Sequence, residues 1–225
     1  MGKSLPYKTK KWEKTKDHLI EKHTKYPASE RFAEAEKLYS DGKLGKARFH
    51  NVLAGRYGIV AQEEFALRHF SECKGLLEKS LNEFLMAIKS AQGNPDDSYV
   101  WENIKIDLKS ATYGYYAIIL DRYNDISAVI SPDTSLYKLI VEKEVIAATE
   151  SKEFIDDMIS AISVKDSEKF EEALKNRIKE VRTNGVDFGV CADFRSMALI
   201  KEAMKAGLTF YKDYIEVDFE MKETI

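Results

Sequence analysis

The stretch that decides the fold is SECKGLLEKSLNEFLMAIKSAQ, which runs from Ser71 to Gln92. Its apolar residues recur at intervals of three and four, and this spacing gathers them on one face of an α-helix. The stripe consists of Cys73, Leu76, Leu77, Leu81, Phe84, Leu85 and Ile88. We therefore predict an amphipathic helix over 71–92, with Leu81 in the core of the protein.

Similar stripes recur on both sides of this stretch, and 225 residues contain only 11 Gly and 4 Pro. Few helix breakers favour long helices over many short strands. We predict an all-α fold of about nine helices, followed after residue 207 by a short extended segment. The expected helices are 8–25, 28–41, 44–70, 71–92, 97–121, 132–148, 151–163, 166–182 and 191–207. The helix over 97–121 is expected to be central, with Leu108 in the core.

Turn and cap residues separate these stripes. Ser131, Pro132 and Asp133 are typical of a helix start. Four glycines follow helical stretches, where a left-handed residue ends a helix; they are Gly42, Gly93, Gly185 and Gly207. Short polar turns between helices favour antiparallel neighbours. We expect an irregular array of helical hairpins in a single domain, 1–225, in which 1–25 is a basic and partly frayed first helix.

Composition argues against a membrane protein. Charged residues make up 32% of the chain, and the longest uncharged apolar run, Ser110–Leu120, is too short for a bilayer, which takes about 20 residues. No apolar stretch typical of a secretory leader follows the first lysines. We expect a cytoplasmic protein. Cys73 and Cys191 are interpreted as buried free thiols, although a disulfide between them remains the alternative.

The charge is unevenly distributed along the chain. Residues 1–25 carry eight Lys against three acids, a net charge of +5, so the remainder carries −8 of the total of −3. A solvated helix explains the lysines, and a nucleic-acid interface is disfavoured because few aromatic residues, such as Trp12 and Tyr26, accompany them. The last 13 residues carry five acids against one Lys. This acidic strip either keeps the chain soluble or meets a basic surface of a partner through Asp213, Tyr214, Glu216, Asp218, Phe219 and Glu220.

No pattern of catalytic or metal-binding residues emerges. His18 and His23 are five residues apart and point away from each other on a helix, and no Cys-x-x-Cys or phosphate-binding loop is present. His69 and Cys73 share a helix face but lack a third orienting group, so they make a poor nucleophile and base pair. Tyr113, Tyr115 and Tyr116 flank Gly114 and indicate either core packing or a binding groove. We predict no catalytic residue, no metal and no cofactor.

The C-terminal half resembles the immunity protein 49 family of polymorphic toxin systems. The resemblance lies in Ala161-Ile-Ser-Val-Lys-Asp166, in Glu168-Lys-Phe-Glu-Glu-Ala-Leu174 with Arg177, and in the helix Ala198-Leu-Ile-Lys-Glu-Ala-Met-Lys-Ala-Gly-Leu208, together with the stretch 111–125. It covers roughly residues 100–220 and rests on helical pattern. It implies an all-helical, non-enzymatic protein that binds a cognate toxin in the bacterial cytosol and neutralises it. No family site residue can be carried over.

Three other functions stay open at this point. A helical-repeat scaffold or adaptor with an unrelated partner is the main alternative, and an enzyme with an unrecognised site and a nucleic-acid binder are the others. The sequence leaves the oligomeric state, the toxin and the binding face undetermined.

Overall fold

The computed structural model describes residues 10–92, 98–147, 154–183 and 192–210. Within these ranges the chain is helical, with eleven α-helices, one 3₁₀ turn, one π-helical turn and no β-strand. The all-α fold class is confirmed. The chain divides into two compact units, one of residues 18–131 and one of residues 1–17 with 132–225. The prediction of a single domain stays a prediction.

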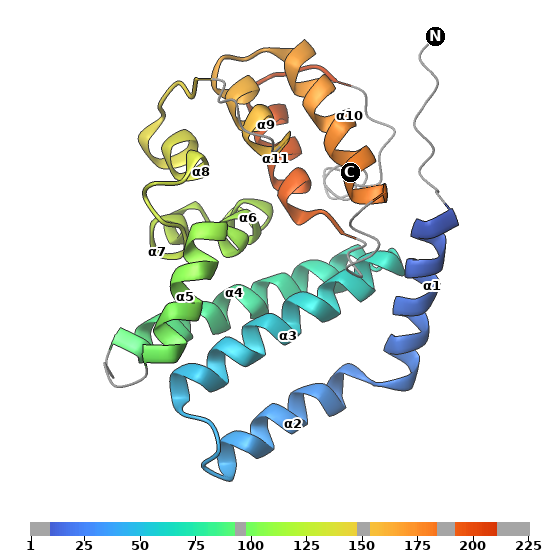
Figure 1. Cartoon of the computed structure of the whole chain (residues 1–225), viewed down its shortest axis with the longest axis vertical. Helices are drawn as coiled ribbons and strands as arrows, with labels where there is room; N and C mark the ends of the chain where they lie inside the picture. Colours follow the sequence, from blue (N-terminus) through green and yellow to red (C-terminus); the bar gives the residue numbers. More distant parts are fainter. Residues whose placement is uncertain (1–9, 93–97, 148–153, 184–191, 211–225) are drawn as a thin grey trace. The chain divides into compact units, whose positions relative to one another are not determined.

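The unit of residues 18–131 is built on a long helical hairpin (Figure 1). Its helices, beginning with one that crosses the unit boundary, are α1 (Lys10–Lys25), α2 (Ala28–Ser40), α3 (Lys46–Ala66), α4 (Phe70–Gln92), α5 (Ser98–Ser110), α6 (Thr112–Ile119) and α7 (Ile126–Val129), with a 3₁₀ turn at Tyr123–Asp125. The helix predicted over 71–92 is thus α4, and Leu81 is fully buried in it. Helices α3 and α4 run antiparallel, because Ser80 donates to the Ala54 carbonyl (2.6 Å) and His50 contacts Glu83 (2.7 Å) further along the pair.

Helix α6 is buried on all sides. The Tyr113 ring stacks on Phe84 of α4, with centroids 3.7 Å apart and planes within 9°. Gly114 faces Ile130, and an added Cβ at Gly114 would lie 2.1 Å from the Ile130 Cδ1. The tyrosine cluster therefore packs in the core, as the first of the two interpretations held, and Gly114 allows the close approach of Ile130.

The second unit contains α8 (Ser135–Tyr137), a π-helical turn (Lys138–Glu142), α9 (Phe154–Ser163), α10 (Ser167–Thr183) and α11 (Phe194–Lys205). Helices α9 and α10 form an antiparallel hairpin, and α11 packs against both (Figure 1). The chain leaves α11 at Gly207, after which Leu208 and Phe210 are buried and Thr209 is exposed. This alternation agrees with the extended segment expected there; its continuation lies outside the described residues.

Two expected helices differ from the structure. The helix over 97–121 is broken at Ala111, which adopts a left-handed conformation (φ 55°) between α5 and α6. Leu108, next to this break, is only partly buried, so its place in the core was wrong. The helix expected over 132–148 is limited to α8 and the π-helical turn, because Lys143 is left-handed (φ 59°). Its start is also later, since the Thr134 side chain caps it by accepting from the Tyr137 backbone N–H.

Two glycines confirm their expected roles at helix ends. Gly42 and Gly207 have φ of 70° and 81°, whereas Gly93 and Gly185 lie outside the described residues. Within the part of the chain that the structure describes, none of the helices has the length and apolar character needed to cross a bilayer.

Candidate protein-binding groove

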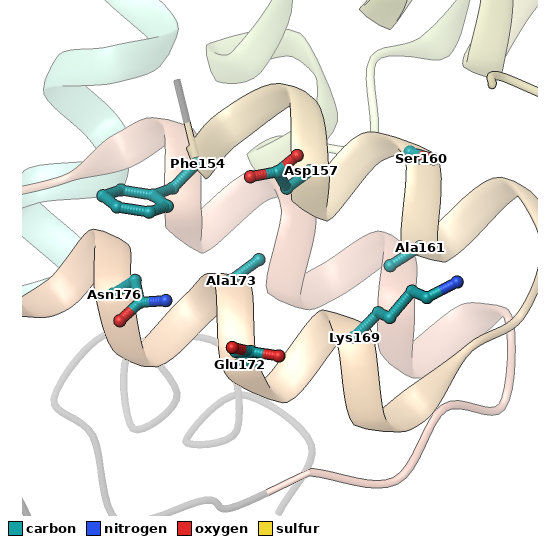
Figure 2. Close-up of a pocket in the computed structure, with 8 residues that line it drawn as sticks. All are labelled: Phe154, Asp157, Ser160, Ala161, Lys169, Glu172, Ala173 and Asn176. Carbon is teal, nitrogen blue, oxygen red and sulfur yellow. The ribbon is translucent and has the colours of Figure 1, made fainter. Parts of the chain in front are cut away.

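A shallow groove runs between α9 and α10 (Figure 2). One side is formed by Phe154, Asp157, Ser160 and Ala161 of α9, and the other by Lys169, Glu172, Ala173 and Asn176 of α10. The groove encloses about 280 Å³, slightly less than the ~300–1,000 Å³ usual for small-molecule sites. We refer to these eight residues as the α9–α10 groove.

Small side chains create the groove. Ala161 and Ala173 face each other across the hairpin (Figure 2), and neither fills the space between the helix axes. The larger apolar residues of both helices are buried in the core; they are Ile155, Met158, Ile159 and Ile162 on α9 and Phe170, Leu174 and Ile178 on α10. The two stripes thus hold the hairpin on the core, and the two alanines, only 1% and 4% exposed, lie at the bottom of the groove.

A tight turn fixes the register of the hairpin. Lys165 is left-handed (φ 56°), and the N–H groups of Lys165 and Asp166 donate back to the carbonyls of Ile162 and Ala161. This pattern closes the end of α9 with paired backbone hydrogen bonds. Asp166 then accepts from the Lys169 backbone N–H at the start of α10 (3.0 Å), so the chain reverses within three residues.

Two carboxylates give the groove its negative charge. Partial burial raises the pKa of Asp157, and the nearby charges of Asp156 and Glu172 raise it further. Neither Asp157 nor Glu172 has an ion-pair partner among the described residues. Lys169 does not form an ion pair with either carboxylate. Its Nζ lies 3.3 Å from the Oδ2 of Asp166, at the turn between α9 and α10.

The polar face of α10 continues beyond the groove. A second hollow is lined by Glu168, Glu171, Glu172, Lys175 and Asn176, and it shares Glu172 and Asn176 with the groove. Lys175 is paired with Glu171 inside this hollow. Glu172 therefore lines both hollows without an ion pair to any described residue, because Lys169 and Lys175 are paired with Asp166 and Glu171.

Buried polar contacts fix the far end of α10 on α11. Asp193 is 4% exposed and caps α11 by accepting from Ser196, whose hydroxyl lies 2.7 Å away. The Arg177 Nε donates to the same carboxylate at 2.8 Å, and its Nη1 donates to Glu180 at 2.6 Å. These contacts hold α10 in a defined position, which makes the groove a rigid feature of its unit.

Sequence reasoning did not find the groove residues, and the residues it proposed lie elsewhere. Asp213, Tyr214, Glu216, Asp218, Phe219 and Glu220 are all outside the described residues. Asp157 and Glu172 were overlooked because each is one acid among many on a polar helix face. The sequence carried no signal for the groove, because the position of Ala161 relative to Ala173 depends on the register of the hairpin.

The pair of His69 and Cys73 does not form a nucleophile and base. The His69 ring turns back to Glu64 (2.9 Å), and Cys73 is fully buried as a free thiol. Burial raises the pKa of the Cys73 thiol far above its usual value, which makes its thiolate inaccessible. Cys191 lies outside the described residues. Within the described ranges no three His, Cys, Asp or Glu residues gather as metal ligands.

Comparisons of this chain with protein-family models, with curated proteins and with solved structures give no match.

Proposed function

We propose that this chain is a bacterial immunity protein, which binds a cognate protein toxin in the cytoplasm and blocks it without turnover. The observation that carries the proposal is the α9–α10 groove, a surface hollow with two carboxylates that form no ion pair among the described residues. The hairpin that forms it, residues 154–183, also carries two of the stretches that resemble the immunity protein 49 family, 161–166 and 168–174 with Arg177.

The physical features of the hairpin suit a docking surface. An exposed negative charge on a rigid element speeds the encounter with a basic protein and helps to fix its orientation. A fixed groove also costs little ordering entropy on binding, so more of the contact energy appears as affinity. Both effects favour a stoichiometric inhibitor, whose action depends only on how tightly and how quickly it associates.

The acidic C-terminal strip remains part of this proposal. We expect Asp213, Glu216, Asp218 and Glu220 to add to the attraction of a basic toxin surface, with Tyr214 and Phe219 as apolar anchors. The two acidic surfaces are separable by mutation, because the groove residues lie within 154–176 and the strip within the last 13 residues.

The test begins with identification of the partner. The tagged chain is used to capture proteins from its native host, and the captured protein is then purified and assayed as a toxin by expression in a sensitive bacterium. Co-expression of this chain should restore growth. A captured partner that is harmless on its own, or a toxin that this chain leaves fully active, would exclude the immunity function and favour the adaptor alternative.

The contribution of the acidic strip is tested with the same toxin. Replacing Asp213, Glu216, Asp218 and Glu220 with Ser should slow association at low salt and reduce its dependence on salt, since screening acts on exposed charges. Association rates of the variant and the wild type that agree at low salt would remove the strip from the interface.

A further inference from the structure

We propose that the α9–α10 groove receives one arginine or lysine side chain from the surface of the partner protein. This inference rests on the proposed function for the identity of the partner, but the recognition chemistry is set by the groove. A basic side chain has an apolar stem that packs on apolar surface and a charged end that keeps polar contacts. The groove offers apolar residues for the stem and carboxylates for the charged end.

The floor and one wall of the groove suit the apolar stem. Ala161 and Ala173 are almost fully buried beneath it, and the Phe154 ring lies along its α9 side (Figure 2). An aromatic ring accepts an alkyl stem and also attracts a cation placed over its face. A volume of about 280 Å³ is appropriate for one inserted side chain.

The charged end is matched by Asp157 and Glu172. They come from different helices and line the same groove, and the pKa of Asp157 is raised first by burial, then by the charge of Asp156, and least by that of Glu172. Two carboxylates close enough to repel each other are stabilised when a cation enters between them. The amide of Asn176, on the same side as Glu172, can accept a further hydrogen bond (Figure 2).

A small molecule and a metal ion fit the groove less well. Its volume lies at the lower edge of the range usual for small ligands, and the two carboxylates are the only acids among its eight residues. A basic side chain on a folded partner binds together with the rest of the interface, so its own contribution to the binding energy can be small. The charge of the groove therefore selects among partners and orients the one that fits.

The first test needs no toxin. The full-length chain is labelled with ¹⁵N and titrated with N-acetyl-arginine amide, and in parallel with N-acetyl-citrulline amide, which has the same shape without the charge. We expect the arginine probe to shift amide signals of residues 154–176 and the citrulline probe to leave them in place. Equal shifts with both probes, or no shift with the arginine probe, would overturn the inference.

Matched variants locate the effect. Asp157→Asn with Glu172→Gln removes two charges from the groove, and Glu142→Gln with Glu144→Gln removes two charges from exposed positions of the same unit. The arginine-induced shifts should be lost in the first variant and kept in the second. Both variants keep side-chain size, and an unchanged spectrum without probe confirms that each is folded. Shifts that persist in the groove variant would contradict the assignment.

Measuring the affinity for the toxin tests the groove inference separately from the proposed function. If the wild-type chain binds the toxin, the groove variant should bind about 10-fold more weakly, and the control variant should bind as the wild type does. Equal toxin affinity of the groove variant and the wild type would overturn the groove inference while the immunity function stands. An arginine-specific response of a chain that binds no toxin would instead leave the groove assignment in place and overturn the function.

Discussion

Gly114 lies where α6 meets the end of α7, and its missing side chain is what brings the two together. A Cβ there would lie 2.1 Å from Cδ1 and 2.2 Å from Cγ1 of Ile130, whose side chain is itself buried. Contacts this short require Ile130 to move within a packed core. The residue thus has a structural role that is independent of any binding function.

Replacing Gly114 with Ala should lower the free energy of unfolding by about 1–2 kcal/mol. The overpacking cost of about 1–3 kcal/mol exceeds the helix-propensity gain of up to about 1 kcal/mol. Gly55→Ala is the control, because Gly55 is a helical glycine of α3 with open space around it, and it should stabilise the protein. Denaturant unfolding of both variants tests this; equal stabilisation by both would contradict the packing described for Gly114.

Asp107 gives a prediction with a defined pH dependence. Burial raises the pKa of this carboxyl above its ordinary value of 3.8. The folded state therefore holds the proton more tightly than the unfolded state, so Asp107 lowers stability as pH rises from 3.8 through its folded pKa. Asp107→Asn should stabilise the protein at pH 7, and the gain should shrink as the pH falls towards 3.8. Unfolding curves between pH 4 and 7 measure it; a gain independent of pH would show that the charge carries no cost.

At the scale of helices, the sequence predicts the apolar stripes more reliably than it predicts the helix ends. Gly42 and Gly207 could be predicted as helix ends because glycine adopts the left-handed conformation freely. Ala111, Asp121 and Lys165 adopt the same conformation without that signal. Alanine and lysine disfavour this conformation, and aspartate adopts it less readily than glycine, so the residue types did not mark these positions. The break at Ala111 was missed for this reason, and so was the early end of the helix expected over 132–148, at Lys143.

The ion pair between Arg31 and the buried Glu63 holds helix α2 against α3. The Glu63 side chain is fully buried, and Arg31 donates to its two oxygens at 2.8 and 2.7 Å. The Arg31 Nε also donates to the Tyr26 carbonyl, at 3.0 Å. A two-pronged pair of this kind fixes both position and orientation, so α2 cannot slide along α3 without exposing or isolating a charge.

Arg31→Ala should therefore destabilise the protein strongly. Removing the arginine leaves the Glu63 carboxylate buried without this partner, which costs about 3–5 kcal/mol in comparable pairs. Lys25→Ala provides the control, since the Lys25–Glu21 pair is exposed on both sides and its loss should leave stability unchanged. Thermal unfolding separates the two variants; a similar small change in both would show that the Arg31–Glu63 pair does not hold α2.

At the scale of the whole molecule, the fold class followed from the sequence, but the groove did not. The stripes at Ile155–Ile162 and Phe170–Val181 correctly predicted two helices and the short turn between them. They gave no indication that Ala161 and Ala173 would lie opposite each other, because that depends on the register of the hairpin. The turn at Lys165 sets this register, and its left-handed residue carries no glycine signal.

The central claim is that this chain acts by binding and not by turnover, and a titration of toxin activity against molar ratio tests it most directly. A fixed amount of purified toxin is mixed with increasing amounts of the chain at concentrations well above the dissociation constant, and the remaining activity is measured. The account predicts a linear fall that ends at one molecule of chain per toxin. Complete inactivation by a small fraction of an equivalent would indicate catalysis, and activity that is unaffected at a large excess would show that no inhibitory complex forms; either result would contradict the account.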